Sequence, residues 1–502
     1  MTRAALVVLA LAAALRAQAP APDVAAIQLP EHVVVTGTLL VDVDGDGRDD
    51  LVLACRDTKT KRRELRVHRR SADSPIFANA PSAPPYAVDS DVIAFTFADC
   101  TPAKGRDLVL FTAERAVAVE FGADGAPNYV PLFVHDLVWP VADPDFVLPL
   151  PNARCDFDRD GRDDLLLPAT RGAALVRNDR QRVPFVVPEW RSPLTASGNG
   201  PATIRGDEVS LRLGLGGRSG DDGSDDDDDR QSGPLVSVRT RTPLTRLVDA
   251  NGDGRLDLIA VRNGRLFFGL QDENGALTMR DSTLPLPADR LSLFDPAFDV
   301  QLVKVDGDAR PDLVLTTSAS RDDEIEVRID VFPTKADLTW EPKPASRLRL
   351  KTLAQAPQLV DVDGDGNLDV VAVTVRTDAL KAITGGGEPT GLEAQLNVFR
   401  GNGERFVMPA LSITQLQLPT KARRGGGAFV EVTPGASGTP GAVLLRDGDV
   451  LQRRPFERDG ERLVLAAPSS KLAIAADTRL DATSDGAVLV RRDHELLHVR
   501  LR

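Results

Sequence analysis

The chain is poor in cysteine, histidine and long apolar segments, and each shortage excludes something. Beyond the N-terminal segment, no stretch approaches the roughly 20 apolar residues of a membrane helix, so we expect no membrane span. The three cysteines, Cys55, Cys100 and Cys155, are an odd number, so at least one thiol is unpaired. We expect them to act as small buried hydrophobic residues, with a pairing of Cys100 with Cys55 or Cys155 as the alternative.

Motifs of catalysis and of nucleic-acid binding are missing as well. The five histidines are dispersed, and there is no serine elbow, HExxH, Walker or Cys-X-X-Cys motif. His494 and His498 fall on one face of an expected strand about 13 Å apart, which is too far for one metal ion. Basic residues are scattered along the chain, so the sequence predicts no nucleic-acid surface.

The sequence does contain a ten-residue motif in four copies: DVDGDGRDDL from Asp42, DFDRDGRDDL from Asp156, DANGDGRLDL from Asp249 and DVDGDGNLDV from Asp361. Oxygen-bearing side chains stand at positions one, three, five and nine, and glycine at position six. Calcium takes about six to eight oxygen ligands, which alternate side chains of a tight loop can supply. Glycine permits the backbone angle that lets position seven offer its carbonyl.

We therefore expect about four calcium sites, one in each loop. The predicted ligands, with a main-chain carbonyl at position seven, are Asp42, Asp44, Asp46, Arg48 and Asp50; Asp156, Asp158, Asp160, Arg162 and Asp164; Asp249, Asn251, Asp253, Arg255 and Asp257; and Asp361, Asp363, Asp365, Asn367 and Asp369.

The EF-hand shares the first half of this motif but requires a bidentate glutamate at position twelve and a helix on each side. Position twelve here is occupied by Leu53, Leu167, Ala260 and Ala372. The flanking segments, such as VVVTGTLLV before Asp42, are rich in β-branched residues and lack a helical period. The motif thus predicts loops between strands.

Four further copies of the motif have lost ligands. The copy from Asp99 keeps Asp107 but has Thr101 and Ala103 at positions three and five. The copy from Lys304 keeps three acids, and we expect the lysine to form an internal ion pair with them in place of a metal. The copies from Glu431 and Asp481 are eroded further. We expect all four to be structural loops without an ion.

The repeat spacing predicts the architecture. The first six copies follow one another at 55 to 57 residues, except for an interval of 93 before Asp249. A unit of this length holds four short strands, and a ring of four-stranded sheets is an all-β propeller. In the first unit we expect strands near 33–41, 51–54, 64–68 and 75–78. In the last we expect strands near Lys471, Ala487 and Glu495, with an outer strand from Val24 that closes the ring; this favours eight blades over the alternative of seven.

With these motifs the chain resembles the FG-GAP or VCBS family of calcium-loop β-propellers, which includes the propeller of integrin α chains. The later part of the family pattern is also present, as in LNVFRGNGERF from Leu396. The resemblance covers residues 24–502, which we expect to form one domain. It implies that the nine-residue loop joins the first two strands of a blade and carries calcium.

The N-terminus predicts export. Arg3, an apolar run from Ala4 to Leu15 and small residues at Ala17 and Ala19 are typical of a signal peptide over residues 1–19. We therefore expect a secreted, periplasmic or cell-surface protein, where calcium is abundant enough to fill weak sites. The net charge is −13, and much of the acid lies in GDDGSDDDDD, within a segment at 216–233 that we expect to be a disordered loop insertion.

The fold predicts where a ligand would bind. Residues that precede the innermost strands should line the face opposite the calcium loops, around the central channel. The candidates there are His32, Trp139, Asp143, Asp145, Arg241 and Asp295. Our leading hypothesis is a non-catalytic adhesion or binding module for a protein or glycan. The alternatives are a carbohydrate-active enzyme resembling a polysaccharide lyase, as some relatives of the family are, and a structural module of a surface assembly.

Overall fold

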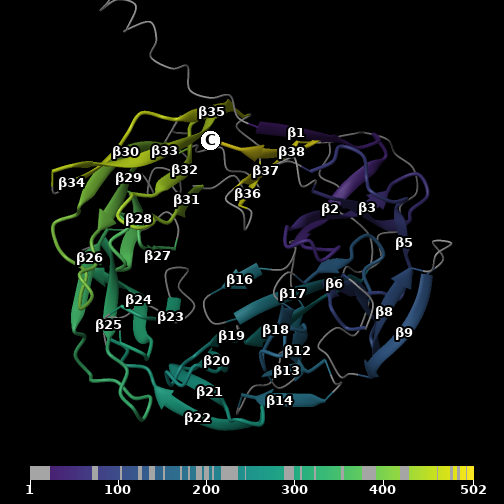
Figure 1. Cartoon of the computed structure of the whole chain (residues 1–502), viewed down its shortest axis with the longest axis horizontal. Coiled ribbons are helices and arrows are strands. Elements are labelled where there is room, and N and C mark those ends of the chain that lie inside the picture. The colour runs from purple at the N-terminus through teal and green to yellow at the C-terminus, as the bar shows by residue number, and fades with distance from the viewer. Residues whose placement is uncertain are drawn as a thin grey trace, which may run out of the picture.

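The computed structural model is a ring of antiparallel β-sheets (Figure 1). No helix among the described residues is long and apolar enough to cross a membrane. The description covers residues 23–70, 77–101, 105–121, 127–134, 142–150, 153–169, 172–178, 181–187, 195–196, 203–205, 208–215, 236–243, 245–287, 299–305, 308–321, 324–351, 356–375, 392–418, 429–460, 462–474, 479–482, 487–492 and 495–501.

Eight of the sheets form the blades of a propeller, each with four antiparallel strands. Blades 1 to 4 contain β2 to β5 (Val33–Val41, Asp50–Asp57, Arg63–His68, Tyr86–Val88), β6 to β9 (Ala94–Ala98, Asp107–Phe111, Arg115–Phe121, Pro127–Val134), β11 to β14 (Arg154–Cys155, Asp164–Ala169, Gly172–Val176, Arg182–Val186) and β19 to β22 (Thr245–Val248, Asp257–Arg262, Arg265–Gln271, Leu277–Thr283).

Blades 5 to 8 complete the ring. They contain β23 to β26 (Asp299–Val303, Asp312–Arg321, Glu324–Phe332, Ser346–Leu350), β27 to β30 (Gln358–Val360, Asp369–Val375, Leu392–Phe399, Ser412–Leu418), β31 to β34 (Val430–Thr433, Ala442–Asp447, Val450–Asp459, Arg462–Leu465), and β36 to β38 (Arg479–Ala482, Val488–Arg492, Glu495–Arg500) with β1 (Asp23–Gln28). Short additional strands pair with β6 (β10, Leu148–Pro149) and with β33 (β35, Ser470–Ala473).

The hydrophobic core is divided among the interfaces between neighbouring blades. Eight clusters of buried residues occur in the described chain, and each joins two adjacent blades. Leu39 and Val52 of blade 1, for example, pack with Phe95 and Leu110 of blade 2. Second strands such as β3 are buried on both faces because each blade is covered by a neighbour on either side, so they are apolar without alternation.

Strands from both ends of the chain close the ring, as the sequence predicts. β1 pairs with β38 over six residues, from Asp23 opposite Arg500 to Gln28 opposite Glu495. Ile27 and Leu496 of this blade then pack against Leu51 of blade 1. Closure removes the open edges of the first and last sheets, and the expectation of eight blades is confirmed.

Two predicted strands are placed differently. The outer strand of blade 1 is β5, eight residues beyond the expected end of that strand at Ala78, while Phe77 forms only an isolated bridge with Arg70. Lys471 lies in β35, which pairs with β33 of blade 7, and the inner strand of blade 8 is β36. The prediction erred because a short exposed strand has no alternation and its partner cannot be inferred from its own residues.

A ninth sheet follows blade 3, with the order β15-β18-β17-β16 (Thr195–Ala196, Val236–Pro243, Glu208–Leu215, Thr203–Arg205). It accounts for the long interval before Asp249, and β16 projects into the central opening in the view of Figure 1. Blades 3 and 4 nevertheless pack directly through Leu175, Phe185 and Leu258. The predicted disordered segment at 216–233 and the signal peptide at 1–19 lie outside the described residues.

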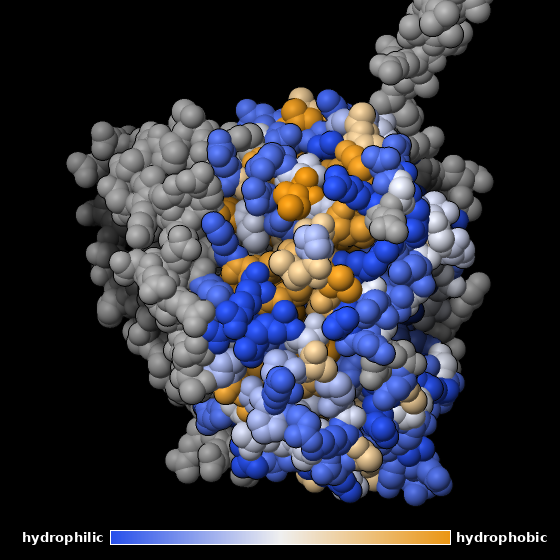
Figure 2. All heavy atoms as spheres, turned by 90° about the vertical axis from the view of Figure 1, so that its left-hand side faces the viewer, coloured by the Kyte–Doolittle hydropathy of each residue, from blue (hydrophilic) through white to orange (hydrophobic). Residues whose placement is uncertain are grey.

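The outer wall is mixed in polarity. Figure 2 faces the side formed by β25, β26, β30 and β34, where apolar atoms gather in the upper half among hydrophilic ones. Ile413 on β30 and Val464 on β34 are exposed there. Exposed apolar residues of this kind are common on the surfaces of folded proteins.

Candidate metal centre

The four motif loops occupy equivalent places in blades 1, 3, 4 and 6. Each joins the first strand to the second, so all four lie at the same face of the ring. The glycine at position six has a positive φ in every loop: 85° at Gly47, 87° at Gly161, 88° at Gly254 and 91° at Gly366. A side chain would be strained there, which explains why the motif requires glycine.

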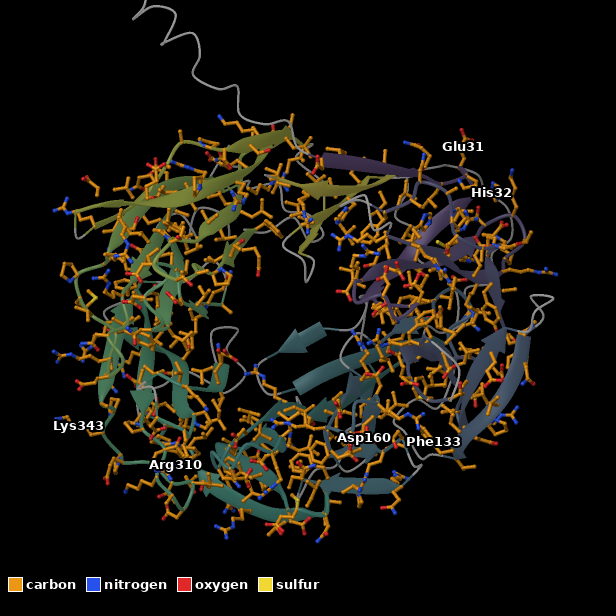
Figure 3. All side chains as sticks on the ribbon, viewed as in Figure 1. Glu31, His32, Phe133, Asp160, Arg310 and Lys343 are labelled. Carbon is orange, nitrogen blue, oxygen red and sulfur yellow. The ribbon has the colours of Figure 1, made fainter. Side chains whose placement is uncertain are left out.

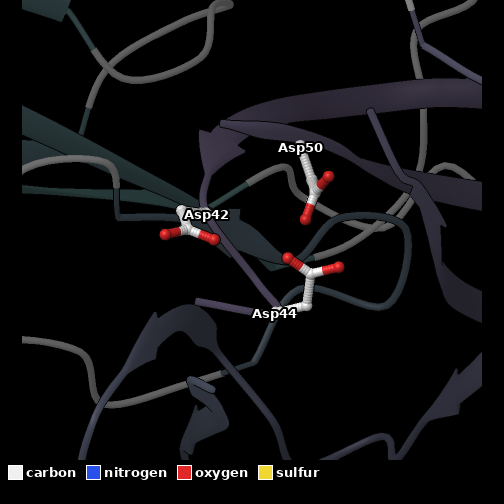
Figure 4. Close-up of side chains that lie close together, drawn as sticks. All are labelled: Asp42, Asp44 and Asp50. Carbon is white, nitrogen blue, oxygen red and sulfur yellow. The ribbon is translucent and has the colours of Figure 1, made fainter. Parts of the chain in front are cut away.

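In blade 1 the loop brings together Asp42, Asp44 and Asp50 (Figure 4). One carboxylate oxygen of each lies within 4.8 Å of the others. Asp42 accepts main-chain N–H donors from Gly45 (2.8 Å), Asp46 (3.1 Å) and Gly47 (2.9 Å), which wraps the loop around its first residue. Asp44 Oδ1 is buried without a hydrogen-bond partner. A buried carboxylate oxygen without a donor is what a divalent cation would satisfy, so these residues fit calcium.

Blades 3 and 6 assemble comparable groups. Asp156, Asp158 and Asp164 approach one another in blade 3, as do Asp361, Asp363 and Asp365 in blade 6, again within 4.8 Å. Asp156 Oδ1 is buried and has no partner. In this loop Arg159, with φ 59°, stands at position four, where the other three loops have glycine.

Not all predicted ligands converge. Asp46 binds the Arg48 side chain at 2.5 Å, Asp160 accepts from Asn178 at 2.6 Å, and Asp253 binds Arg255 at 2.5 Å. Asp249, Asp253 and Asp257 form no group of three in blade 4, where position three is Asn251, and Asp369 lies outside the group of blade 6. At position seven, the N–H of Arg48, Arg162, Arg255 and Asn367 donates to the carboxylate at position five.

The aspartate at position nine has a role that the sequence reasoning missed. One of its oxygens accepts the N–H of loop position two, and the other accepts an N–H just beyond or at the end of the third strand. The pairs, at 2.8–3.1 Å, are Val43 and Arg70 on Asp50, Phe157 and Asn178 on Asp164, Ala250 and Gln271 on Asp257, and Val362 and Gly401 on Asp369. This residue therefore ties the loop to its blade.

The signal for this role was present in the sequence. Position nine is still aspartate in two of the four copies where we expect no ion, as Asp107 and Asp312. Asp107 accepts from Cys100 N (3.1 Å), Thr101 N (2.8 Å) and Thr101 Oγ1 (3.0 Å), and Asp312 accepts from Val305 N (3.0 Å). A residue kept where the ion ligands are lost points to a structural duty.

Electrostatics favours a cation in these loops. Burial raises the pKa of Asp164, Asp257 and Asp369 to about 6. By contrast, the hydrogen bond from the Arg48 side chain lowers the pKa of the exposed Asp46. Weakened, buried acids next to further carboxylates are a concentration of negative charge that a divalent ion would relieve.

In one of the copies with lost ligands, a hydrogen bond within the loop replaces a possible ion ligand. In blade 2 Thr101 occupies position three and donates its hydroxyl to Asp107. The expected ion pair of Lys304 involves Asp306, which lies outside the described residues, and Lys304 forms no ion pair with the residues that are described. All three cysteines are free, with Cys55 fully buried, which agrees with their role as small hydrophobic residues.

The predicted ligand residues on the opposite face are only partly brought together. His32 lies 3.8 Å from Asp57 and, in Figure 3, at the outer rim of the ring. Asp145 pairs with Arg56 at 2.8 Å, and the Asp143 carbonyl accepts from Arg63 at 2.8 Å. Arg241 pairs with Ser210 through the backbone of the ninth sheet. Trp139 and Asp295 lie outside the described residues.

Arg63 is a residue of this face that the sequence reasoning did not select. It is 3 % exposed and donates to the carbonyls of Asp89, Val92, Asp143 and Phe146, which belong to the segments before β6 and β10. Burial lowers its pKa, and the acids Asp143, Asp91, Asp89 and Asp145 oppose that shift. Because its N–H groups point to carbonyls, Arg63 braces these segments.

Comparisons with known proteins assign no family to the chain. No family profile matches the chain, and no curated protein matches it. Among solved structures, a lectin from Agrocybe aegerita that recognises non-reducing terminal N-acetylglucosamine is similar, with 11 % identity, coverage of 91 % of this chain and 92 % of that chain, and a TM-score of 0.39. The Dos1 propeller is similar with 10 % identity, coverage of 82 % and 93 %, and a TM-score of 0.32.

Proposed function

We propose that the chain is an exported, calcium-stabilised propeller of the FG-GAP or VCBS kind that serves as a non-catalytic binding module for a protein or glycan. The observation that carries the calcium part is the convergence of three carboxylates in each of blades 1, 3 and 6. In blades 1 and 3, one of these carboxylates has a buried oxygen that lacks a hydrogen-bond partner. Oxygen-only ligand sets in flexible loops suit calcium better than zinc or copper.

Export supports the same proposal. Sites formed by short loops at the surface are expected to bind calcium weakly, and such sites fill only where calcium is near millimolar. The signal-like N-terminus would take the chain to such a compartment. The free cysteines, one buried and two half-buried, are compatible with an oxidising environment because their partial or full burial limits reaction of the thiols.

The binding role is assigned to the face opposite the calcium loops. Ion-bearing loops would make one face of the ring rigid, while the other face carries the longer connections around Arg56, Arg63 and Asp145. Charged groups on a rigid scaffold are the usual carriers of recognition. A glycan or peptide offers the hydroxyl and amide groups that such a surface can bind.

The first test is the calcium content of the purified mature protein, measured together with its melting temperature in calcium and in EDTA. We expect about four ions per chain and a clear fall in melting temperature with EDTA, since an ion that binds only the folded state adds to its stability. Near-zero content without a shift would mean that the loops are hydrogen-bonded turns, and the calcium proposal would fail.

A matched pair of variants assigns the ions to loops. Asp44→Ala removes position three of blade 1 and should reduce the calcium content by one ion. Thr101→Ala, at the same position of blade 2, should leave it unchanged because Thr101 serves Asp107 and no ion. Equal calcium content in both variants would contradict the assignment.

The binding part needs its own test. Immobilised protein would be screened against glycans and peptides in calcium, with Arg56→Ala as the variant expected to weaken a hit. Turnover of a polyuronate in the same screen would favour a lyase instead. Hits that are unaffected by changes on this face would move the site elsewhere.

A further inference from the structure

At the end of the third strand of each of these four blades, one residue varies together with the residue at loop position three. The N–H of Arg70, Asn178, Gln271 and Gly401 donates to the position-nine aspartate of blades 1, 3, 4 and 6. The residue just before that donor is Arg69, Arg177, Leu270 and Arg400, respectively. Three of these are arginine, and the fourth is an aliphatic residue.

The three arginines all bind the carboxylate at position three. Arg69 Nη1 lies 3.5 Å from Asp44 Oδ2, Arg177 Nη2 lies 2.7 Å from Asp158 Oδ2, and Arg400 Nε donates to Asp363 Oδ2 at 3.0 Å. Arg400 also binds the same oxygen through Nη2. In every case the arginine contacts the Oδ2 oxygen of the carboxylate.

The fourth loop supplies the comparison. Blade 4 has Asn251 at position three, so it has no charge for an arginine to balance, and Leu270 stands where the other blades have arginine. Leu270 packs instead at the margin of the core between blades 4 and 5. Among these four loops, a carboxylate at position three and an arginine at the end of the third strand are thus present together or absent together.

Burial makes the arginine necessary. The Asp363 side chain is 0 % exposed, that of Asp158 14 % and that of Asp44 29 %, so an unpaired charge there is costly, most of all in blade 6. The neighbouring cation Arg458 is 3.8 Å from Asp363 and donates mainly to its carbonyl, at 2.7 Å. Arg400 is therefore the principal counter-charge of this carboxylate.

We propose that Arg69, Arg177 and Arg400 are built-in counter-cations that hold the position-three carboxylate when calcium is absent, and that they oppose calcium when it binds. The inference rests on the proposed calcium function. It makes the three loops fold-competent without the ion, and it sets their calcium affinity below that of the same carboxylates without an arginine. These are positioning residues that act through Asp44, Asp158 and Asp363.

The test uses the full chain and two variants at blade 6. Arg400→Leu gives this blade the residue of blade 4 while it keeps the buried Asp363. The double variant Asp363→Asn/Arg400→Leu recreates the pair of blade 4 in full. Melting temperature in EDTA reports the ion-free role, and calcium titration by calorimetry reports the effect on affinity.

In EDTA we expect Arg400→Leu to melt several degrees below wild type and the double variant to recover most of that loss. In calcium, Arg400→Leu should gain more melting temperature than wild type does. One of its sites should bind calcium about tenfold more tightly, because a unit positive charge a few ångströms from the divalent ion has been removed.

Two results would overturn the inference. If Arg400→Leu melts like wild type in EDTA, or the double variant melts no higher than Arg400→Leu, the arginine is not a counter-charge. If calcium binds more weakly to Arg400→Leu, the arginine assists the ion. A wild type that binds no calcium would remove the proposed function and the ion-opposing role together, whereas bound calcium with no recovery in EDTA would remove this inference alone.

Discussion

The loops of blades 1 and 2 share a scaffold and differ in their charges. Both end in a buried aspartate, Asp50 or Asp107, that accepts main-chain N–H groups of the loop. Blade 1 adds two further carboxylates to this aspartate, whereas blade 2 has Thr101 at position three, which donates to Asp107. The comparison separates two tasks: position nine shapes the loop, and positions one and three gather the charge for an ion.

The two loops also contact each other. Arg106 of the blade 2 loop donates its N–H to the Val43 carbonyl at 3.0 Å, and its guanidinium lies 3.2 Å from Asp42 and 2.9 Å from Asp163. A blade that has lost its own ion ligands thus places a cation between the ion-capable loops on either side. The loop of blade 2 lacks ion ligands of its own, but its arginine contacts the loops of both neighbouring blades.

The largest effect should come from breaking what the two kinds of loop share. Asp369→Ala leaves the N–H groups of Val362 and Gly401 buried without an acceptor, and Asp107→Ala removes the acceptor of both the N–H and the hydroxyl of Thr101. We expect each variant to lose about 2–6 kcal/mol of folding stability in EDTA. Thermal or denaturant unfolding would measure this loss.

Equal losses in the ion-capable and the ion-free blade would support a structural role of position nine. If Asp107→Ala were as stable as wild type, the structural role would be contradicted, and position nine would act only as an ion ligand. The control Thr101→Ala removes only the hydroxyl donor and should cost less than Asp107→Ala.

The shared scaffold explains which parts of the molecule the sequence could predict. The repeat, the loop glycines and the expected outer strand from Val24 were sufficient for eight blades, the course of β2 and the closure by both termini. Central strands are predictable because burial on both faces forces them to be apolar. β5, three residues long and preceded by the proline-rich PSAPP, carries no such constraint and was missed.

Within the loops, the sequence could predict which oxygens gather but not all that they bind. The sequence does not distinguish an aspartate that accepts an amide N–H from one that binds an ion. The structural role of Asp50 therefore became visible only with its partners Val43 and Arg70. The arginines at the end of the third strand are far from the motif in sequence. Their contact depends on the strand register, which the motif does not encode.

A smaller effect is expected from the cation that joins the two loops. Arg106→Met keeps the main-chain bond to Val43 but removes the ion pairs with Asp42 and Asp163. We expect a loss of about 1–2 kcal/mol in EDTA, because the pairs are only partly buried. In calcium the loss should shrink, since the ion would neutralise Asp42.

Melting temperatures of Arg106→Met in both conditions, with Arg106→Lys as the charge-preserving control, would measure this. A loss that is the same in calcium and in EDTA would argue that Arg106 acts by packing alone.

The smallest change, and the finest comparison, concerns the cysteines beside the two loops. Cys155 precedes the loop of blade 3 in which three carboxylates converge, Cys100 lies in the loop of blade 2, where we expect no ion, and Cys55 is fully buried in β3. Burial raises the pKa of all three thiols to about 12, so at pH 8 they stay protonated in the folded chain and should react slowly with an alkylating reagent. Since the thiolate is the reactive form, the labelling rate should rise with pH toward 12, not level off above about 9 as it would in the unfolded chain.

Calcium removal loosens only a loop that held an ion, so EDTA should speed the labelling of Cys155, leave Cys100 nearly unchanged and leave Cys55 protected. Peptide mass spectrometry after timed labelling would resolve the three sites. If EDTA sped the labelling of Cys100 more than that of Cys155, the ion would belong to blade 2 instead of blade 3, and the comparison between the two loops would be reversed.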